Sequence, residues 1–136
     1  MQVRDGMSSE LLTVGPEHTL RGVARQMAQR GIGSAIVLDP EMPGPGILTE
    51  RDILNAVGRG LDVDAERVCD HLTADLVFAA PDWSLEQAAS TMSRGGFRHL
   101  IVVEDGEIIG MLSVRDIVRC WTEDGATSEM PAPRAA

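Results

Sequence analysis

Two short stretches of the chain place a hydroxyl side chain and a carboxylate at the same spacing. One runs from Thr49 to Asp52 and the other from Ser113 to Asp116, and each follows a Gly and two apolar residues. In both, the pattern predicts that a strand ends and a helix begins, so free N–H groups and the positive end of the helix dipole favour a phosphate. The Asp on the first turn can accept hydrogen bonds from both hydroxyls of a ribose. The stretches therefore suggest sites for a phosphorylated sugar.

The same spacing also has a purely structural explanation. A Thr or Ser followed three residues later by Asp approximates a helix capping box, which Glu or Gln normally completes. Arg51 and Arg115 lie in the same turns and can reach a phosphate with a forked guanidinium, but solvated surface arginines explain them equally well. Both interpretations stay open on these residues, and one Asp can serve both.

The two stretches belong to an internal repeat that covers most of the chain. At an offset of 65 residues Val3 matches Val68 and Pro16 matches Pro81; the offset becomes 64 after the longer loop at 39–45. The repeats are expected at 1–60 and 61–122, followed by a disordered tail at 123–136. Each half would bury only a marginal core alone, so we expect the halves to share an interface.

Each copy is predicted to contain strand, helix, strand, strand and helix. The ranges are 11–14, 20–30, 34–38, 46–49 and 51–57 in the first copy, and 76–79, 84–94, 98–103, 108–113 and 115–121 in the second. Apolar residues recur at helical spacing in 20–30, with Thr19 as cap and Gly31 as stop. The helix between the first two strands implies a crossover and the next two strands a hairpin, so the fold class is α/β (α+β).

Composition excludes several classes of protein. The net charge of −9 argues against binding DNA or RNA, and the apolar runs are too short to cross a membrane. The N-terminus has no apolar signal core, so a cytoplasmic protein is expected. Cys69 and Cys120 are expected to be buried free thiols. No cluster has metal-ligand spacing and no catalytic motif occurs, so neither a metal nor an enzyme is expected.

The order of elements and the duplicated motif resemble a tandem cystathionine-β-synthase (CBS) domain pair over residues 1–122. In both copies the motif follows a Val-x-Asp, a Pro-acid pair and a helix–Gly–strand step. The resemblance implies two repeats packed as a pseudo-twofold pair (a Bateman module) with two clefts between them. Such clefts bind AMP, ADP, ATP, S-adenosylmethionine, NAD or cyclic dinucleotides. These modules generally regulate a partner protein and form homodimers rather than catalyse reactions.

The resemblance also assigns roles to single residues. Arg98 and His99 resemble a basic pair that grips phosphates, whereas Ser34 and its neighbour Gly33 carry no charge at the matching positions, so unequal clefts are expected. An exposed strand end is the other explanation for the basic pair. Small residues before the equivalent prolines would admit adenine, although turn geometry explains them almost as well. The expected ligand residues are Gly15, Ser34, Ala35, Thr49, Arg51, Asp52, Ala80, Arg98, His99, Ser113, Arg115 and Asp116.

The functional hypothesis is a stand-alone regulatory module. It would bind an adenosine-type ligand, an adenine nucleotide or S-adenosylmethionine, and signal its occupancy to an unidentified effector protein. A homodimer is expected, with Trp121 as a dimer contact, and no cofactor beyond the regulatory ligand. The alternative is a ligand-free dimeric scaffold whose motif residues only cap helices. An enzyme acting on nucleotides lacks a nucleophile–base or metal constellation.

Overall fold

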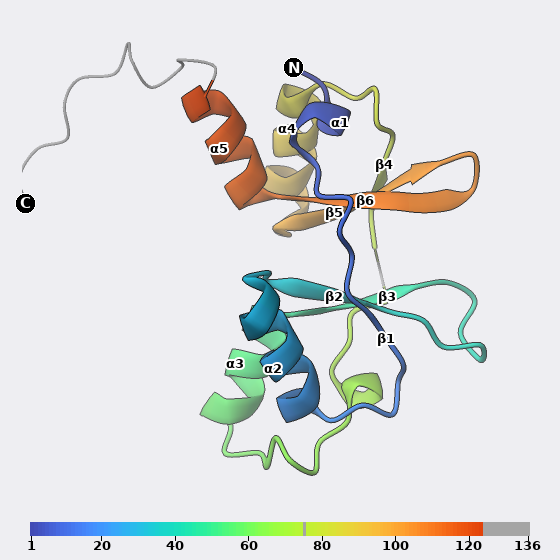
Figure 1. Ribbon diagram of the computed structural model, residues 1–136, viewed down its shortest axis with the longest axis vertical. Helices are drawn as coiled ribbons and strands as arrows, with labels where there is room; N and C mark the ends of the chain where they lie inside the picture. Colours follow the sequence, from blue (N-terminus) through green and yellow to red (C-terminus); the bar gives the residue numbers. More distant parts are fainter. Residues whose placement is uncertain (75, 124–136) are drawn as a thin grey trace, which may run out of the picture. The chain divides into compact units, whose positions relative to one another are not determined.

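The computed structural model describes residues 1–74 and 76–123. The described residues contain five α-helices, one 3₁₀ turn and two three-stranded sheets (Figure 1). The predicted mixed α/β class is confirmed. The chain divides into two compact units, one formed by Glu10–Leu76 and the other by Met1–Ser9 together with the chain from Val77 onward. Of the tail expected at 123–136, Glu123 ends a helix and the other residues lie outside the described part.

The unit Glu10–Leu76 has the predicted crossover and hairpin. Its elements are β1 (Thr13–Val14), α2 (Leu20–Arg30), β2 (Ser34–Val37), β3 (Gly46–Thr49), α3 (Glu50–Gly58) and the 3₁₀ turn η1 (Val68–Asp70). Strand β2 lies in the middle, parallel to β1 and antiparallel to β3. Helices α2 and α3 cover one face of this sheet (Figure 1).

Local signals set the bounds of helix α2 as predicted. The side chain of Thr19 accepts a hydrogen bond of 3.1 Å from the backbone N–H of Gly22, which satisfies one of the free donors of the first turn. Gly31 adopts a left-handed φ of 64° and ends the helix. Strand β1 is shorter than predicted because only Thr13 and Val14 pair with β2.

The other unit repeats the order of the strands and longer helices. Its elements are α1 (Val3–Gly6), β4 (Phe78–Ala79), α4 (Leu85–Gly95), β5 (His99–Glu104), β6 (Glu107–Ser113) and α5 (Val114–Glu123). Its one-turn helix α1 comes first in the chain, whereas η1 comes last in the unit Glu10–Leu76. Strand β5 is parallel to β4 and antiparallel to β6. The two-residue turn between β5 and β6 has positive φ angles at Asp105 (52°) and Gly106 (80°), as a type I′ hairpin turn requires.

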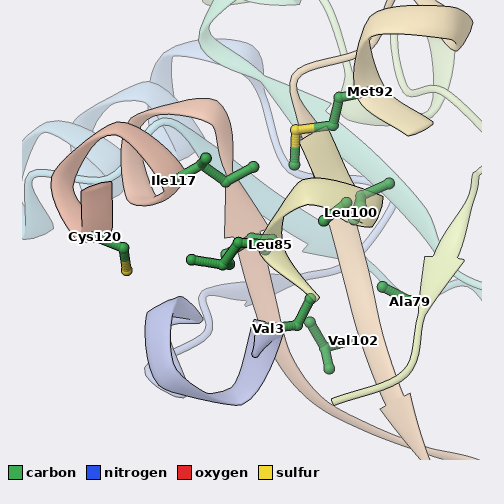
Figure 2. Packing of buried hydrophobic residues seen from close by; sticks show 10 residues of the cluster. Val3, Ala79, Leu85, Met92, Leu100, Val102, Ile117 and Cys120 are labelled. Atoms are coloured by element: carbon green, nitrogen blue, oxygen red, sulfur yellow. The ribbon is translucent and has the colours of Figure 1, made fainter. Parts of the chain in front are cut away.

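The compact units do not coincide with the repeats of the sequence. The N-terminal segment 1–9 packs with the strands and helices of the second copy. Val3 is fully buried there in one core cluster with Leu85 and Leu100, and Figure 2 shows the three side chains close together. Val68, the residue that matches Val3, is buried instead in the core of the first copy, with Leu20. The segment that precedes each first strand is therefore exchanged between the copies.

The two cysteines differ. Cys120 of α5 is buried in the cluster of Figure 2, as expected. Cys69 is exposed, so the prediction of a buried thiol is wrong there. The reason is the single 3₁₀ turn η1, in which Val68 takes the buried position and its neighbour Cys69 is turned to solvent.

Candidate functional site

In the first copy the motif residues gather at the end of the sheet where α3 begins. Ser34, the first residue of β2, is the cross-strand partner of Thr49, the last residue of β3. The backbone N–H of Glu50, the first residue of α3, donates a hydrogen bond of 2.9 Å to the carbonyl of Gly33. The loop before β2 and the N-terminus of α3 are thereby joined at one place.

Thr49 and Asp52 form a reciprocal capping box. The Thr49 backbone N–H and hydroxyl donate to Asp52 Oδ2 at 2.9 and 3.0 Å, and the Asp52 backbone N–H donates to Thr49 Oγ1 at 3.2 Å. The structural explanation of the motif is therefore realised. Both of the donations from Thr49 use the same oxygen of Asp52, so the box engages one side of the carboxylate.

The second copy has the same arrangement at the N-terminus of α5. His99, the first residue of β5, is the cross-strand partner of Ser113. The Ser113 backbone N–H donates to Asp116 Oδ2 at 2.8 Å, and the Asp116 backbone N–H donates to Ser113 Oγ at 3.1 Å. The Val114 N–H donates to the carbonyl of Arg98 at 3.0 Å. A basic pair, a hydroxyl and a carboxylate thus meet at one helix N-terminus.

Arg119 is a further neighbour of this site that the sequence analysis did not select. Its Nη2 donates to the carbonyl of Gly6 at 3.0 Å and lies 3.4 Å from Asp116 Oδ1. Desolvation lowers the pKa of Arg119, but the hydrogen bond to Asp116 and nearby negative charges outweigh it and the net shift is upward. The available signal was the spacing of an acid and a base three residues apart on a helix. The first copy has Asn55 at the matching position.

The small residues lie at the other end of each sheet. Val14 pairs with Val37 at the end of β2, so the following Gly15 lies far from Ser34 at the start of that strand. Ala80 is placed in the same way after Ala79, which pairs with Val102 of β5. Within one unit the structure therefore does not bring Gly15 or Ala80 to the motif Asp.

The remaining expected residues take two kinds of position. Ala35 is 1% exposed and belongs to the core of its unit. Arg51 and Arg115 are exposed in the first turns of α3 and α5, beside the capping boxes.

Within residues 1–74 and 76–123, no group of three or more His, Cys, Asp or Glu could hold a metal ion. No helix in this part of the chain has the length and apolar character that a membrane span requires.

Comparison with known proteins establishes the family. The model of the CBS domain matches the chain twice, at residues 2–59 and 68–123. These matches cover most of the chain, one for each copy of the repeat. The chain therefore belongs to the CBS domain family, and the resemblance inferred from the duplicated motif is confirmed.

Relatives of different length share this pair of domains. A CBS domain-containing protein of Bacillus subtilis is 30% identical over 116 residues, which are 85% of this chain and 81% of that protein. An uncharacterized protein of Methanocaldococcus jannaschii is 28% identical over 94% of this chain, but the chain spans only 45% of its length. A solved CBS domain protein of Pyrobaculum aerophilum, complexed with AMP, is 28% identical with a TM-score of 0.77, covering 93% of this chain and 99% of that one.

Proposed function

We propose that this chain is a regulatory CBS-pair module, not an enzyme, which binds an adenosine-type ligand in the clefts expected between its repeats. It signals occupancy to a partner protein and assembles as a homodimer. The observation that carries the proposal is the meeting of Arg98, His99, Ser113 and Asp116 at the N-terminus of α5. The AMP complex of the relative from Pyrobaculum aerophilum supports the class of ligand.

The chemistry of this cluster suits a nucleoside phosphate. The α5 N-terminus presents the positive end of its helix dipole to a phosphate, and Arg98 adds a cation that can make two parallel hydrogen bonds. The capping box uses Oδ2 of Asp116. The other oxygen still has lone pairs for ribose hydroxyls, since a carboxylate can accept about four hydrogen bonds. Capping and ligand binding are therefore compatible in one residue.

The positions of Gly15 and Ala80 support a site that takes its residues from both copies. Strand β2 is four residues long, so its two ends lie about 10 Å apart at roughly 3.3 Å per residue. Gly15 follows one end and Ser34 begins the other. A single copy would therefore have difficulty offering both an adenine contact and a ribose contact to one nucleoside. The proposal takes these contacts from different copies.

Regulation then follows from thermodynamic linkage. A ligand that contacts both copies favours one arrangement of them over others. It shifts that equilibrium only by the difference between its affinities for the two arrangements. A partner protein that binds one arrangement better would sense the ligand.

Calorimetric titration with AMP tests the proposal. Asp116→Ala should weaken AMP binding, because it removes the ribose acceptor, and it should also lower stability by about 1 kcal/mol through loss of the cap. Ser84→Ala is the matched control: Ser84 caps α4 by accepting from the Gln87 N–H at 3.0 Å, but it belongs to no expected ligand set. It should cost similar stability and leave AMP affinity unchanged.

The observed capping boxes are also consistent with a second function, the ligand-free dimeric scaffold. A thermal-shift series with AMP, ADP, ATP, S-adenosylmethionine, NAD and cyclic dinucleotides separates the two. A rise in melting temperature with any of these compounds supports the sensor. If none raises it and Asp116→Ala behaves like Ser84→Ala in every measurement, the scaffold is the better description.

A further inference from the structure

The two helix N-termini have the same backbone but opposite charges. The first N–H of α3 donates to the carbonyl of Gly33 at 2.9 Å, and the first N–H of α5 donates to the carbonyl of Arg98 at 3.0 Å. Gly33 thus stands where the second copy has Arg98, and Glu50 stands where it has Val114. Because the backbones agree, the difference between the two ends lies in the side chains.

The carboxylate of Glu50 is folded over Gly33. A Cβ at Gly33 would lie 3.3 Å from both Cδ and Oε1 of Glu50, which is closer than nine in ten Cβ contacts. The φ of Gly33 is not positive, so backbone conformation does not require glycine there. Because Gly33 has no side chain, it leaves room for the Glu50 carboxylate. In the other copy the side chain of Arg98 extends from the matching backbone position.

The two differences between the copies, Gly33 for Arg98 and Glu50 for Val114, change the charge near a bound ligand. Around the start of α3 the charged side chains are Glu50, Arg51 and Asp52, whereas around the start of α5 they are Arg98, Arg115, Asp116 and Arg119. A negative charge near an anionic ligand is repulsive, and this repulsion is a common device for rejecting a wrong partner. The negative charge of Glu50 also interacts favourably with the positive end of the α3 helix dipole.

We infer that Glu50, with Gly33 beneath it, is a specificity-determining residue that makes the α3 end reject phosphorylated adenosine compounds. That end is selective for adenosine derivatives without a phosphate, while the α5 end takes the phosphorylated ones. This inference rests on the proposed function, because it divides the ligands of the same two sites between them.

Calorimetric titration of the full chain with AMP and, separately, with adenosine and S-adenosylmethionine tests the inference. The wild type should bind AMP strongly at one site per chain and weakly or not at all at a second. Glu50→Gln keeps the size of the side chain and should strengthen the weaker AMP site by about tenfold or more. Glu50→Val with Gly33→Arg copies the second repeat and should strengthen it further. Adenosine shows whether a neutral ligand suffices, and S-adenosylmethionine whether a cationic sulfonium binds better.

The reciprocal variant is the matched control. Val114→Glu with Arg98→Gly should weaken the strong AMP site and leave adenosine binding nearly unchanged. The effect of Glu50→Gln on AMP should shrink as salt concentration rises, because exposed charges are screened; a change that acted only through folding would not show this dependence. Melting temperatures of all variants confirm that they fold.

The outcomes separate the two proposals. Two equal AMP sites in the wild type, or a weak site that Glu50→Gln does not strengthen, overturn the role of Glu50 while the regulatory module stands. If neither AMP, adenosine nor S-adenosylmethionine binds the wild type or any variant, adenosine sensing itself is wrong.

Discussion

The backbone N–H of Val3 donates a hydrogen bond of 2.8 Å to the carbonyl of Trp83, which lies in the second copy of the repeat. The matching bond in the other unit joins Val68 to the carbonyl of His18 at 2.9 Å. Each copy of the strands and helices is therefore completed by a segment that belongs, by sequence, to the other copy. The exchange ties the folding of each unit to both halves of the chain.

Val3→Ala should destabilise the unit that contains β4, β5 and β6. Val3 is fully buried, so losing two methyl groups and leaving a cavity should cost about 1–3 kcal/mol. Native-state hydrogen exchange should accelerate mainly in β5, β6 and α5, whereas Val68→Ala should accelerate it in β2, β3 and α3. Leu38→Ala, at an exposed position after β2, is the control and should change little. Faster exchange in β2 and β3 after Val3→Ala would contradict the assignment.

Much of the fold could be predicted because its signals are local. Thr19 and Gly31 set the ends of α2, and the same kind of cap, Ser84, begins α4. The repeat made the order of elements certain, since each copy checks the other. The exchange of segments could not be predicted, because Val3 and Val68 are equivalent in the repeat. Equivalence alone does not say which copy a segment packs against.

The candidate site was predictable to the extent that its residues follow the repeat. Thr49 and Asp52 interact as the capping box requires. Arg119 was missed because the first copy has Asn55 there, so the repeat drew no attention to it. The effect of Glu50 on Gly33 depends on a side-chain conformation, which no sequence pattern specifies.

Gly6→Ala should test how closely α1 packs on α5. A Cβ at Gly6 would lie 2.7 Å from Sγ of Cys120, a short side chain with little freedom to move away. Overpacking of this kind costs about 1–3 kcal/mol. Chemical denaturation should show this loss, and Cys120→Ala should relieve part of it, so that the two changes are not additive. Gly58→Ala at the end of α3, where a Cβ would meet nothing within 4 Å, is the control and should be neutral or stabilising.

The buried thiol of Cys120 should make stability fall in alkaline solution. Desolvation by burial raises the pKa of Cys120 above its ordinary value of 9.0. As the pH rises above that value the unfolded chain loses the thiol proton while the folded chain keeps it, so the stability present at lower pH is progressively lost. The free energy of unfolding, measured from pH 8 upward, should therefore fall less in Cys120→Ala than in the wild type.

Cys69 supplies the control for that measurement. Desolvation, followed by the charges of Asp70 and Glu17, also raises its pKa, but the side chain is exposed. An aromatic disulfide reagent should label Cys69 in the native protein and reach Cys120 only as the unit unfolds. Equal labelling of both thiols, or an alkaline slope that Cys120→Ala leaves unchanged, would contradict the burial argument.

Trp121→Ser should weaken the proposed homodimer. Helix α5 exposes Val118 and Trp121, whose spacing of three residues places them on one face of the helix. Leu54 and Val57 of α3, which match Val118 and Trp121, are exposed too, so both copies of the repeat carry the same apolar pair. A second copy of the chain carries the same two apolar pairs and can offer a matching surface, which favours it over an unrelated partner. Trp at such a position often carries a large share of binding energy.

Sedimentation velocity measures the outcome over a range of protein concentrations. The wild type should sediment as a dimer, and Trp121→Ser should shift the equilibrium toward monomer by about tenfold or more in the dissociation constant, because a central Trp commonly contributes at least 2 kcal/mol. Leu38→Ser removes an exposed apolar side chain at the end of β2 opposite the start of α3, and it should leave the dimer intact. If both variants sediment like the wild type dimer, the interface is not on α5. If the wild type is already a monomer at all concentrations, the homodimer itself is excluded.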